Sequence, residues 1–238
     1  MNYFYPLAEN KDPETDPLMD QLPEGYTFAA KIFYPYVRMP KFPEAEKAAQ
    51  SPNYPSDEDI LRYGEPVSWE EIRRLTGLAD VSEVSIAIVP RLIGFLKHCR
   101  KIYQRPDLVE KLEESLPENI LYPDEDRISV LLIQNILSVL SSNGATSIKY
   151  ETLYGDKGTL EIKDIQLENI IYLSSQLITI SDEYEEFSFT CFFDEVSAVF
   201  AAKKDCRELL VKSGFEGIIF DEKTPLVWEG SQYTLLRT

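Results

Sequence analysis

The chain has 238 residues, and its 41 acidic residues outnumber its 24 lysines and arginines, which gives a formal net charge of −17. Nucleic-acid binding depends mainly on neutralising phosphates with Lys and Arg, so this charge argues against a nucleic-acid partner, and it also opposes binding to an anionic membrane surface. A basic protein is the partner that it favours. With 44% hydrophobic and 12% aromatic residues, the chain can build a real core.

Targeting and redox signals are few. The first residues, MNYFYPLAENKDPE, contain no basic segment followed by an apolar one, so we expect no secretory signal. The longest apolar region, Val130–Leu140, is too short to span a bilayer, and we expect a cytoplasmic protein without membrane contact. Cys99, Cys191 and Cys206 lie far apart in the sequence, which predicts neither a disulfide framework nor a zinc site.

The N-terminal segment, residues 1–66, holds ten of the fifteen prolines together with many aromatic residues. Proline removes a backbone donor and restricts the preceding residue, so long helices are not expected here. We predict an extended arm wrapped on the body of the protein, with a short strand around Thr27–Phe33.

Helical signals begin near the end of this segment and continue beyond it. Ser56 and the acids after it predict a helix through Arg62, and Ser68 with Glu71 forms a capping-box pattern for a helix that stops at Gly77. Val84–Val89 is either a strand or the segment that leads into the next helix. That helix is predicted over Pro90–Gln104 with Pro90 in its first turn, and two more helices are predicted over Asp107–Ser115 and Arg127–Ser142.

Strand character dominates after a soft boundary near residue 145. We expect a single α+β domain over residues 1–238, with a helical N-terminal and central part packed on a small mixed or antiparallel sheet formed mainly after residue 145. The expected elements are a hairpin over Thr146–Ile162, a helix over Asp164–Ser174, strands at Ile178–Ile180, Phe187–Phe193 and Val196–Ala201, a helix over Lys204–Ser213, and a strand at Gly217–Asp221.

A set of acidic residues at predicted strand ends is the first candidate site. If the strand ends converge, these carboxylates would hold a divalent cation or act as a paired acid and base. Solvated charges at turns are the alternative, since the spacing matches no calcium loop and HExxH is absent. The candidates are Asp182, Glu185, Asp194, Glu195, Asp221 and Glu222.

A basic segment is the second candidate, because residues 91–105 contain no acid in a chain that is otherwise acidic. It would bind an anion, or it would pair with acidic neighbours inside the fold. Its members are Arg91, Lys97, His98, Arg100, Lys101 and Arg105. His98 would also form a nucleophilic dyad if the fold brought it to Cys191 or Cys206.

The phosphate-binding and hydrolase motifs GxGxxG, GxxxxGK[ST] and GxSxG do not occur. We therefore assign no catalytic residue and no metal ligand, and we expect no cofactor.

Two stretches, FTCFFDEVSAVFAAKKDCRELLVKSGFEGIIFDEKTPLVW at Phe189–Trp228 and GEPVSWEEIRRLTGL at Gly64–Leu78, carry a family resemblance. They resemble an uncharacterised family of acidic bacterial proteins that is defined only as a domain of unknown function. This resemblance implies no activity, cofactor or catalytic residue.

Three functional hypotheses remain. The first is a soluble, non-enzymatic interaction protein, immunity-like or inhibitory, that presents an acidic face to a basic target. The alternative is a metal-assisted hydrolase or transferase that uses the candidate carboxylates. The third is mimicry of nucleic acid, which would need regularly spaced acids on one face.

Overall fold

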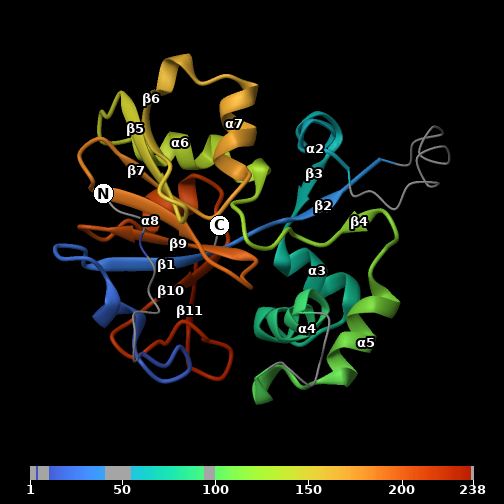
Figure 1. Cartoon of the computed structure of the whole chain (residues 1–238). Coiled ribbons are helices and arrows are strands. Elements are labelled where there is room, and N and C mark those ends of the chain that lie inside the picture. The colour runs from blue at the N-terminus through green and yellow to red at the C-terminus, as the bar shows by residue number, and fades with distance from the viewer. Residues whose placement is uncertain (1–3, 5–10, 41–54, 94–99, 237–238) are drawn as a thin grey trace.

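The computed structural model describes residue 4 and residues 11–40, 55–93 and 100–236 (Figure 1). Over these residues, seven α-helices, α2 to α8, combine with an eight-stranded sheet and a three-stranded sheet. The α+β class is thus confirmed. The expected small sheet is wrong in size, because β1 from the N-terminal segment joins the strands that follow residue 145.

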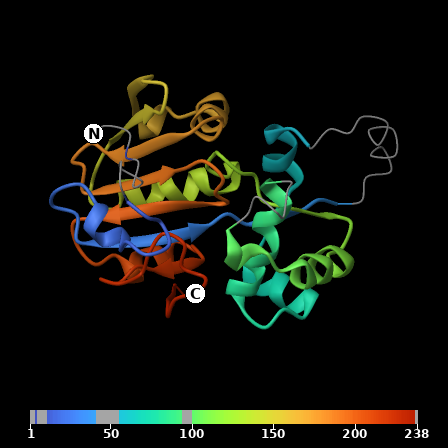
Figure 2. The ribbon, with the colours of Figure 1, turned by 60° about the horizontal axis from the view of Figure 1, so that its bottom comes forward.

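The large sheet has the strand order β11-β10-β1-β9-β8-β7-β5-β6, and its neighbouring strands pair antiparallel. Figures 1 and 2 show it on one side of the molecule, with α6 running along the sheet. Its strands are β1 (Phe28–Phe33), β5 (Ser147–Thr152), β6 (Lys157–Glu161), β7 (Ile178–Asp182), β8 (Phe187–Cys191), β9 (Ser197–Ala202), β10 (Gly217–Ile219) and β11 (Thr234–Leu236).

Strand β1 confirms the strand predicted near Thr27–Phe33, but it is an inner strand of the sheet and not a surface arm. All six of its residues are buried. Ala30 pairs with Phe200 of β9 on one side and with Ile219 of β10 on the other. A strand buried on both faces needs side chains that tolerate full burial, which small and apolar residues satisfy and Lys31 does not.

A second layer of structure lies beside the large sheet (Figures 1 and 2). The chain leaves β1 and forms β2, which pairs antiparallel with β3 and β4. This small sheet was not predicted, since its strands are only two or three residues long. The elements here are β2 (Tyr36–Arg38), β3 (Glu65–Val67), β4 (Ile120–Leu121), α2 (Asp57–Tyr63), α3 (Trp69–Thr76), α4 (Val81–Ile93) and α5 (Pro106–Ser115).

The helix caps predicted from sequence are confirmed at both predicted starts. The Ser56 hydroxyl accepts the Asp59 N–H at 3.2 Å, and the Ser68 hydroxyl accepts the Glu71 N–H at 3.0 Å. Gly77 ends α3 with a left-handed φ of 70°. The reciprocal half of the predicted capping box is replaced, because the Glu71 carboxylate binds Arg38 at 2.5 Å.

Helix α4 corrects the prediction around Pro90. The ambiguous segment Val84–Val89 is helical, and Pro90 lies inside the helix and not in a first turn. The predicted helix over Pro90–Gln104 is only partly described, since residues 94–99 lie outside the described part. After that gap, Lys101–Tyr103 forms a 3-10 turn.

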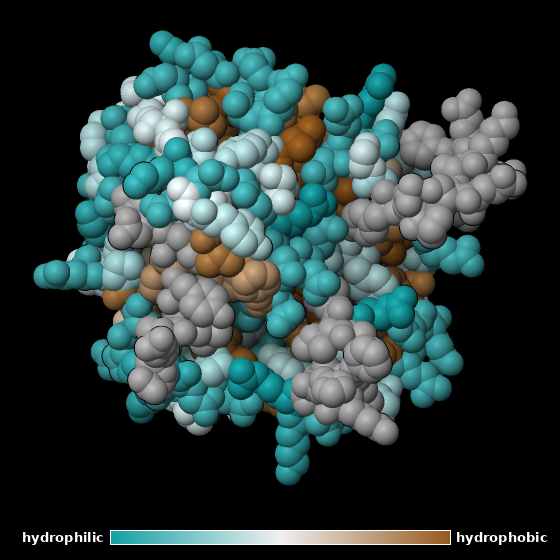
Figure 3. Space-filling model, viewed as in Figure 1, coloured by the Kyte–Doolittle hydropathy of each residue, from teal (hydrophilic) through white to brown (hydrophobic). Residues whose placement is uncertain are grey.

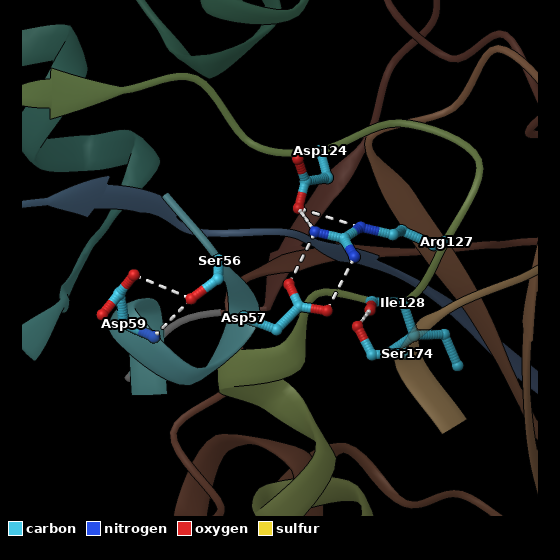
Figure 4. A network of polar contacts seen from close by, with 7 residues as sticks. All are labelled: Ser56, Asp57, Asp59, Asp124, Arg127, Ile128 and Ser174. Atoms are coloured by element: carbon cyan, nitrogen blue, oxygen red, sulfur yellow. Dashed lines mark hydrogen bonds and ion pairs between the residues drawn. The ribbon is translucent and has the colours of Figure 1, made fainter. Parts of the chain in front are cut away.

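The remaining helices are α6 (Ile133–Ser141), α7 (Leu167–Ser174) and α8 (Arg207–Lys212). Helix α6 starts later than predicted, after a 3-10 turn at Val130–Leu132. The reason lies in Arg127, which was expected inside the helix. Its guanidinium donates two hydrogen bonds to Asp57, at 2.8 and 2.9 Å, and also binds Asp124 (Figure 4). This network ties the start of α2 to the loop before α6.

The core is continuous between the two sheets. The Phe33 ring stacks on Trp69 of α3 at 4.2 Å between centroids and on Trp228 of the C-terminal segment at 5.6 Å. On the face in Figure 3, hydrophilic side chains surround small separate hydrophobic patches. Among the described residues, no helix is both long and apolar enough to cross a membrane.

Candidate functional site

A cavity of about 270 Å³ lies where the large sheet meets α4 and the C-terminal segment. We call it the central cavity, and it is lined by residues of β1, β9 and the turn before β9, α4, the 3-10 turn at Lys101–Tyr103, and residues 226–229. Its apolar walls combine aromatic and aliphatic side chains. The aromatic ones include Phe33, Trp69, Phe192, Phe193 and Trp228, and Val89 of α4 is one of the aliphatic ones.

Lys31 is the least expected residue of this cavity, because lysine is almost never fully buried. Its position on β1 points its side chain to the same face of the strand as Phe33. The residue is only 4% exposed. Its ammonium contacts a Glu195 carboxylate oxygen at 2.9 Å and donates to the Leu226 carbonyl at 3.2 Å. Taking this charge out of water costs several kcal/mol, which the single ion pair only partly offsets.

Glu229 is the second buried charge-bearing group. One carboxylate oxygen accepts the Ser85 hydroxyl at 2.5 Å, and the other accepts the Tyr103 hydroxyl at 3.0 Å. The Ser82 hydroxyl holds the Glu229 backbone carbonyl at 3.0 Å. Helix α4 therefore fixes both ends of this residue, since Ser82 and Ser85 lie three residues apart on one face.

Burial raises the pKa of Glu229 above its ordinary value, although Lys31 and the Ser85 hydrogen bond act in the opposite direction. Burial also raises the pKa of Tyr103 well above its usual range, and the neighbouring Glu229 adds to this effect. Tyr103 is therefore a hydrogen-bond donor at neutral pH and not a base. The arrangement provides one buried cation and two carboxylates of different character in an aromatic cavity, a combination typical of ligand sites.

The raised pKa of Glu229 predicts a pH-dependent loss of stability. The folded state holds the proton of the Glu229 carboxyl group more tightly than the unfolded state. Protonated Glu229 therefore stabilises the fold fully below the ordinary pKa of 4.5, and this stabilisation is lost as the pH rises through the folded pKa. We expect the free energy of unfolding of the native chain, relative to Glu229→Gln, to fall as the pH increases from 4.5. Urea unfolding of the native chain and of Glu229→Gln at a series of pH values from 4.5 upward measures this difference in free energy.

Glu183 supplies a control of opposite sign. The Thr146 backbone N–H lowers the pKa of Glu183, so its contribution is present above the unfolded pKa and is lost as the pH falls. The native chain should therefore gain stability relative to Glu183→Gln as the pH rises. Parallel pH profiles for the native chain and Glu229→Gln would contradict the prediction for Glu229.

The six candidate carboxylates do not form one cluster. Asp194 and Glu195 precede β9, whereas Asp182 and Glu185 lie at the turn before β8, beside the far end of β9. Asp221 and Glu222 follow β10, which is separated from β8 by β1 and β9. Within the described residues, no group of three or more His, Cys, Asp or Glu side chains is arranged to hold a metal ion.

Several of these acids instead stabilise turns. Asp182 accepts the backbone N–H of Phe187 at 2.7 Å and of Tyr184 at 3.1 Å. Asp221 accepts the hydroxyl of Thr224 at 2.7 Å, and this hydrogen bond lowers the pKa of Asp221. Glu185 pairs with Lys149 at 3.0 Å, and Glu222 is exposed.

Of the six predicted carboxylates, those of Asp194 and Glu195 belong to residues that line the central cavity. Asp194 has a left-handed φ of 58°, and its N–H donates to Asp126, which is also left-handed, at 2.6 Å. Burial and the nearby Asp194 raise the pKa of Asp126. Left-handed backbone at two non-glycine residues is typical of functional sites. The Asp194 carboxylate also adds negative charge at this edge of the cavity.

The basic segment is divided among several elements. Arg91 pairs with Glu113 at 3.2 Å, Arg100 with Glu14 at 2.6 Å, and Arg105 with Asp107 at 2.7 Å. These pairs match the alternative of internal pairing. Arg100 lines the central cavity, Lys101 is exposed, and Lys97 and His98 lie outside the described residues, so the anion site stays a prediction.

The cysteines that were considered as dyad partners of His98 are unsuited to nucleophilic attack. Burial raises the pKa of Cys191 to about 12 and that of Cys206 to about 11. Both thiols are therefore protonated at neutral pH.

Four residues of the site were not proposed from the sequence: Lys31, Ser85, Tyr103 and Glu229. Only Lys31 carries a usable signal, since a lysine stands in the otherwise apolar run FAAKIF. Ser85, Tyr103 and Glu229 come from distant segments, and no local pattern links them.

The fold and the central cavity together define an α+β protein with a buried, mixed polar and aromatic cavity. A family model described as "Protein of unknown function (DUF2711)" matches residues 14–230, and the chain belongs to this family. It is also 32% identical over 219 residues to "Uncharacterized protein YwbB" of Bacillus subtilis (strain 168), covering 90% of this chain and 96% of that protein. No solved structure matches the chain. The resemblance to an uncharacterised bacterial family is thus confirmed.

Proposed function

We propose that this chain is a binding protein that takes a small organic ligand into the central cavity. The observation that carries the proposal is Lys31, a buried cation on an inner strand of the large sheet, whose ion pair with Glu195 lies on the cavity wall. A buried ion pair is weak support for stability by itself. A buried ion pair that shares a cavity with Glu229, whose pKa is raised by burial, more often marks a binding site.

The size of the cavity supports a compact ligand. Roughly 150 Å³ is enough space for a benzene molecule in a protein interior. The central cavity, at about 270 Å³, has room for one ring with a polar substituent. Phe193 lines it and is 46% exposed, so the cavity reaches the surface at this ring.

A fragment screen by ligand-observed NMR tests this function. We expect some uncharged, anionic or cationic ring compounds to bind the native chain and to lose binding in Val89→Trp, which fills the cavity. Val211→Trp on α8 is the matched control, because Val211 is half-buried outside the cavity lining. The proposal is wrong if no fragment distinguishes Val89→Trp from the other two proteins.

The sequence-based hypothesis of a basic protein partner stays a prediction. A surface groove between α4 and α5 gives it some support, since three acids of α5 line it. They are Glu110, Glu113 and Glu114, although Arg91 already pairs with Glu113. Its test is recovery of a basic protein by pull-down at low salt with loss at moderate salt. The metal-assisted alternative is not proposed, because its six carboxylates lie apart.

A further inference from the structure

Hydrogen bonds already occupy several acceptors of the central cavity. Both carboxylate oxygens of Glu229 accept a hydroxyl, from Ser85 and from Tyr103. One oxygen of Glu195 accepts the Ser197 hydroxyl at 2.9 Å and contacts the Lys31 ammonium at 2.9 Å. A ligand donor directed at Glu229 would therefore compete with hydroxyl groups already in place.

The donors are less well satisfied. Trp228 is fully buried and lines the cavity, yet its indole N–H has no hydrogen-bond acceptor among the described residues. The Lys31 ammonium has three N–H groups and contacts two acceptors, Glu195 and the Leu226 carbonyl. Buried donors without acceptors destabilise a protein, so a ligand acceptor that reached the Trp228 N–H or the Lys31 ammonium would gain a hydrogen bond.

Charges of both signs line the cavity and restrict the charge of a ligand. An anion would meet Asp194, Glu195 and Glu229, and the two cations of the lining that would favour it are already paired, Lys31 with Glu195 and Arg100 with Glu14. A cation would meet Lys31 and Arg100. In a site of low dielectric, an unpaired ligand charge of either sign is costly, so an uncharged ligand fits best.

The walls favour a flat ring. Phe33 is part of a stack with Trp69 and Trp228, and the rings of Phe192 and Phe193 also line the cavity. Aromatic walls bind planar groups through stacked and edge contacts.

Resting on the binding function proposed above, we infer that the ligand of the central cavity is a small uncharged ring compound whose carbonyl oxygen accepts the indole N–H of Trp228. The Lys31 ammonium, which lines the same cavity, is a second donor available to the ligand. Recognition by Trp228 would satisfy the one buried donor of the cavity lining that lacks an acceptor within the described residues.

The test uses three ring compounds of nearly equal shape on the full chain: benzamide (uncharged), benzoate (anion) and benzamidine (cation). The chain has two tryptophans, so an ¹H–¹⁵N spectrum shows two indole signals. Benzamide is expected to shift the Trp228 signal downfield and to bind about tenfold more tightly than either charged analogue. The Trp69 signal should move little, because its indole N–H already donates to the Tyr34 carbonyl at 2.8 Å.

Two variants assign the effect. Trp228→Phe keeps a ring but removes the donor, and it should lose about tenfold in benzamide affinity. Tyr36→Phe is the matched control, since it removes another buried group that lacks a partner among the described residues but lies outside the cavity lining. Its affinity should equal that of the native chain. The spectra of the native chain keep the test valid even if Trp228→Phe does not fold.

The outcomes separate the two proposals. Tighter or equal binding of benzoate or benzamidine in the cavity would overturn the ligand class and leave the binding function standing. If none of the three compounds moves the Trp228 signal and the fragment screen also finds no ligand, the cavity holds only water and both proposals fail.

Discussion

Replacing Lys31 with methionine is expected to lower the free energy of unfolding by about 3–5 kcal/mol. Methionine keeps the unbranched apolar stem and removes the ammonium group. The Glu195 carboxylate then loses its cationic partner, and the Leu226 carbonyl loses a donor. Much of the cost comes from the buried charge that remains and not from the ion pair itself. Urea unfolding at neutral pH measures it.

The double variant Lys31→Met with Glu195→Gln separates these two contributions. Because it removes both charges, it should recover a large part of the stability lost in Lys31→Met, with a coupling of about 1–3 kcal/mol between the two sites. The exposed pair Lys149–Glu185 gives the matched control, since its side chains are 39% and 37% exposed. Lys149→Met should cost no more than about 1 kcal/mol. A Lys31→Met variant as stable as Lys149→Met would show that the buried charge is not costly.

If the double variant recovers the stability lost in Lys31→Met, the chain retains an ion pair that a purely structural role does not require. A hydrophobic residue in place of a buried ion pair is often neutral or stabilising. That result would favour a ligand over the fold as the reason for Lys31, because natural proteins accept such local costs mainly at functional sites.

Local signals predicted the local structure well. The Ser56 and Ser68 caps, the left-handed end of α3 at Gly77, and the hairpin of β5 and β6 each depend on residues that are neighbours in sequence. Pro90 was placed wrongly, because proline costs least in a first turn, whereas this proline lies buried inside α4.

Long-range pairing could not be predicted in the same way. The sequence shows that Phe28–Phe33 is suited to a strand, but no pattern in it shows that β1 inserts between β9 and β10, more than 160 residues away. The central cavity exists only because of that insertion, which brings Lys31 to Glu195 and to the segment that holds Glu229. The candidate carboxylates failed as a cluster for the same reason, since strand order decides which ends meet.

Gly217→Ala is expected to cost about 3 kcal/mol or more, because it forces apart the two strands that place Lys31. Gly217 of β10 lies opposite Ile32 of β1. A Cβ atom at this glycine would lie 1.9 Å from the Lys31 carbonyl oxygen, which is backbone and has no side-chain rotation to relieve the overlap. The glycine has no left-handed φ, so the predicted loss is steric and not conformational.

Gly230→Ala is the matched control. Its added Cβ would lie 3.1 Å from the end of the Ile102 side chain, which has rotatable bonds, and no left-handed φ is involved. Without a backbone overlap, Gly→Ala restricts the unfolded chain and is neutral or stabilising by up to about 1 kcal/mol. Urea unfolding should therefore rank Gly230→Ala near the native chain and Gly217→Ala far below it, and equal stabilities would contradict the close contact of β1 with β10. Where Gly217→Ala still folds, the shifted β1 should also weaken benzamide binding, since the same strand carries Lys31 and Phe33 into the central cavity.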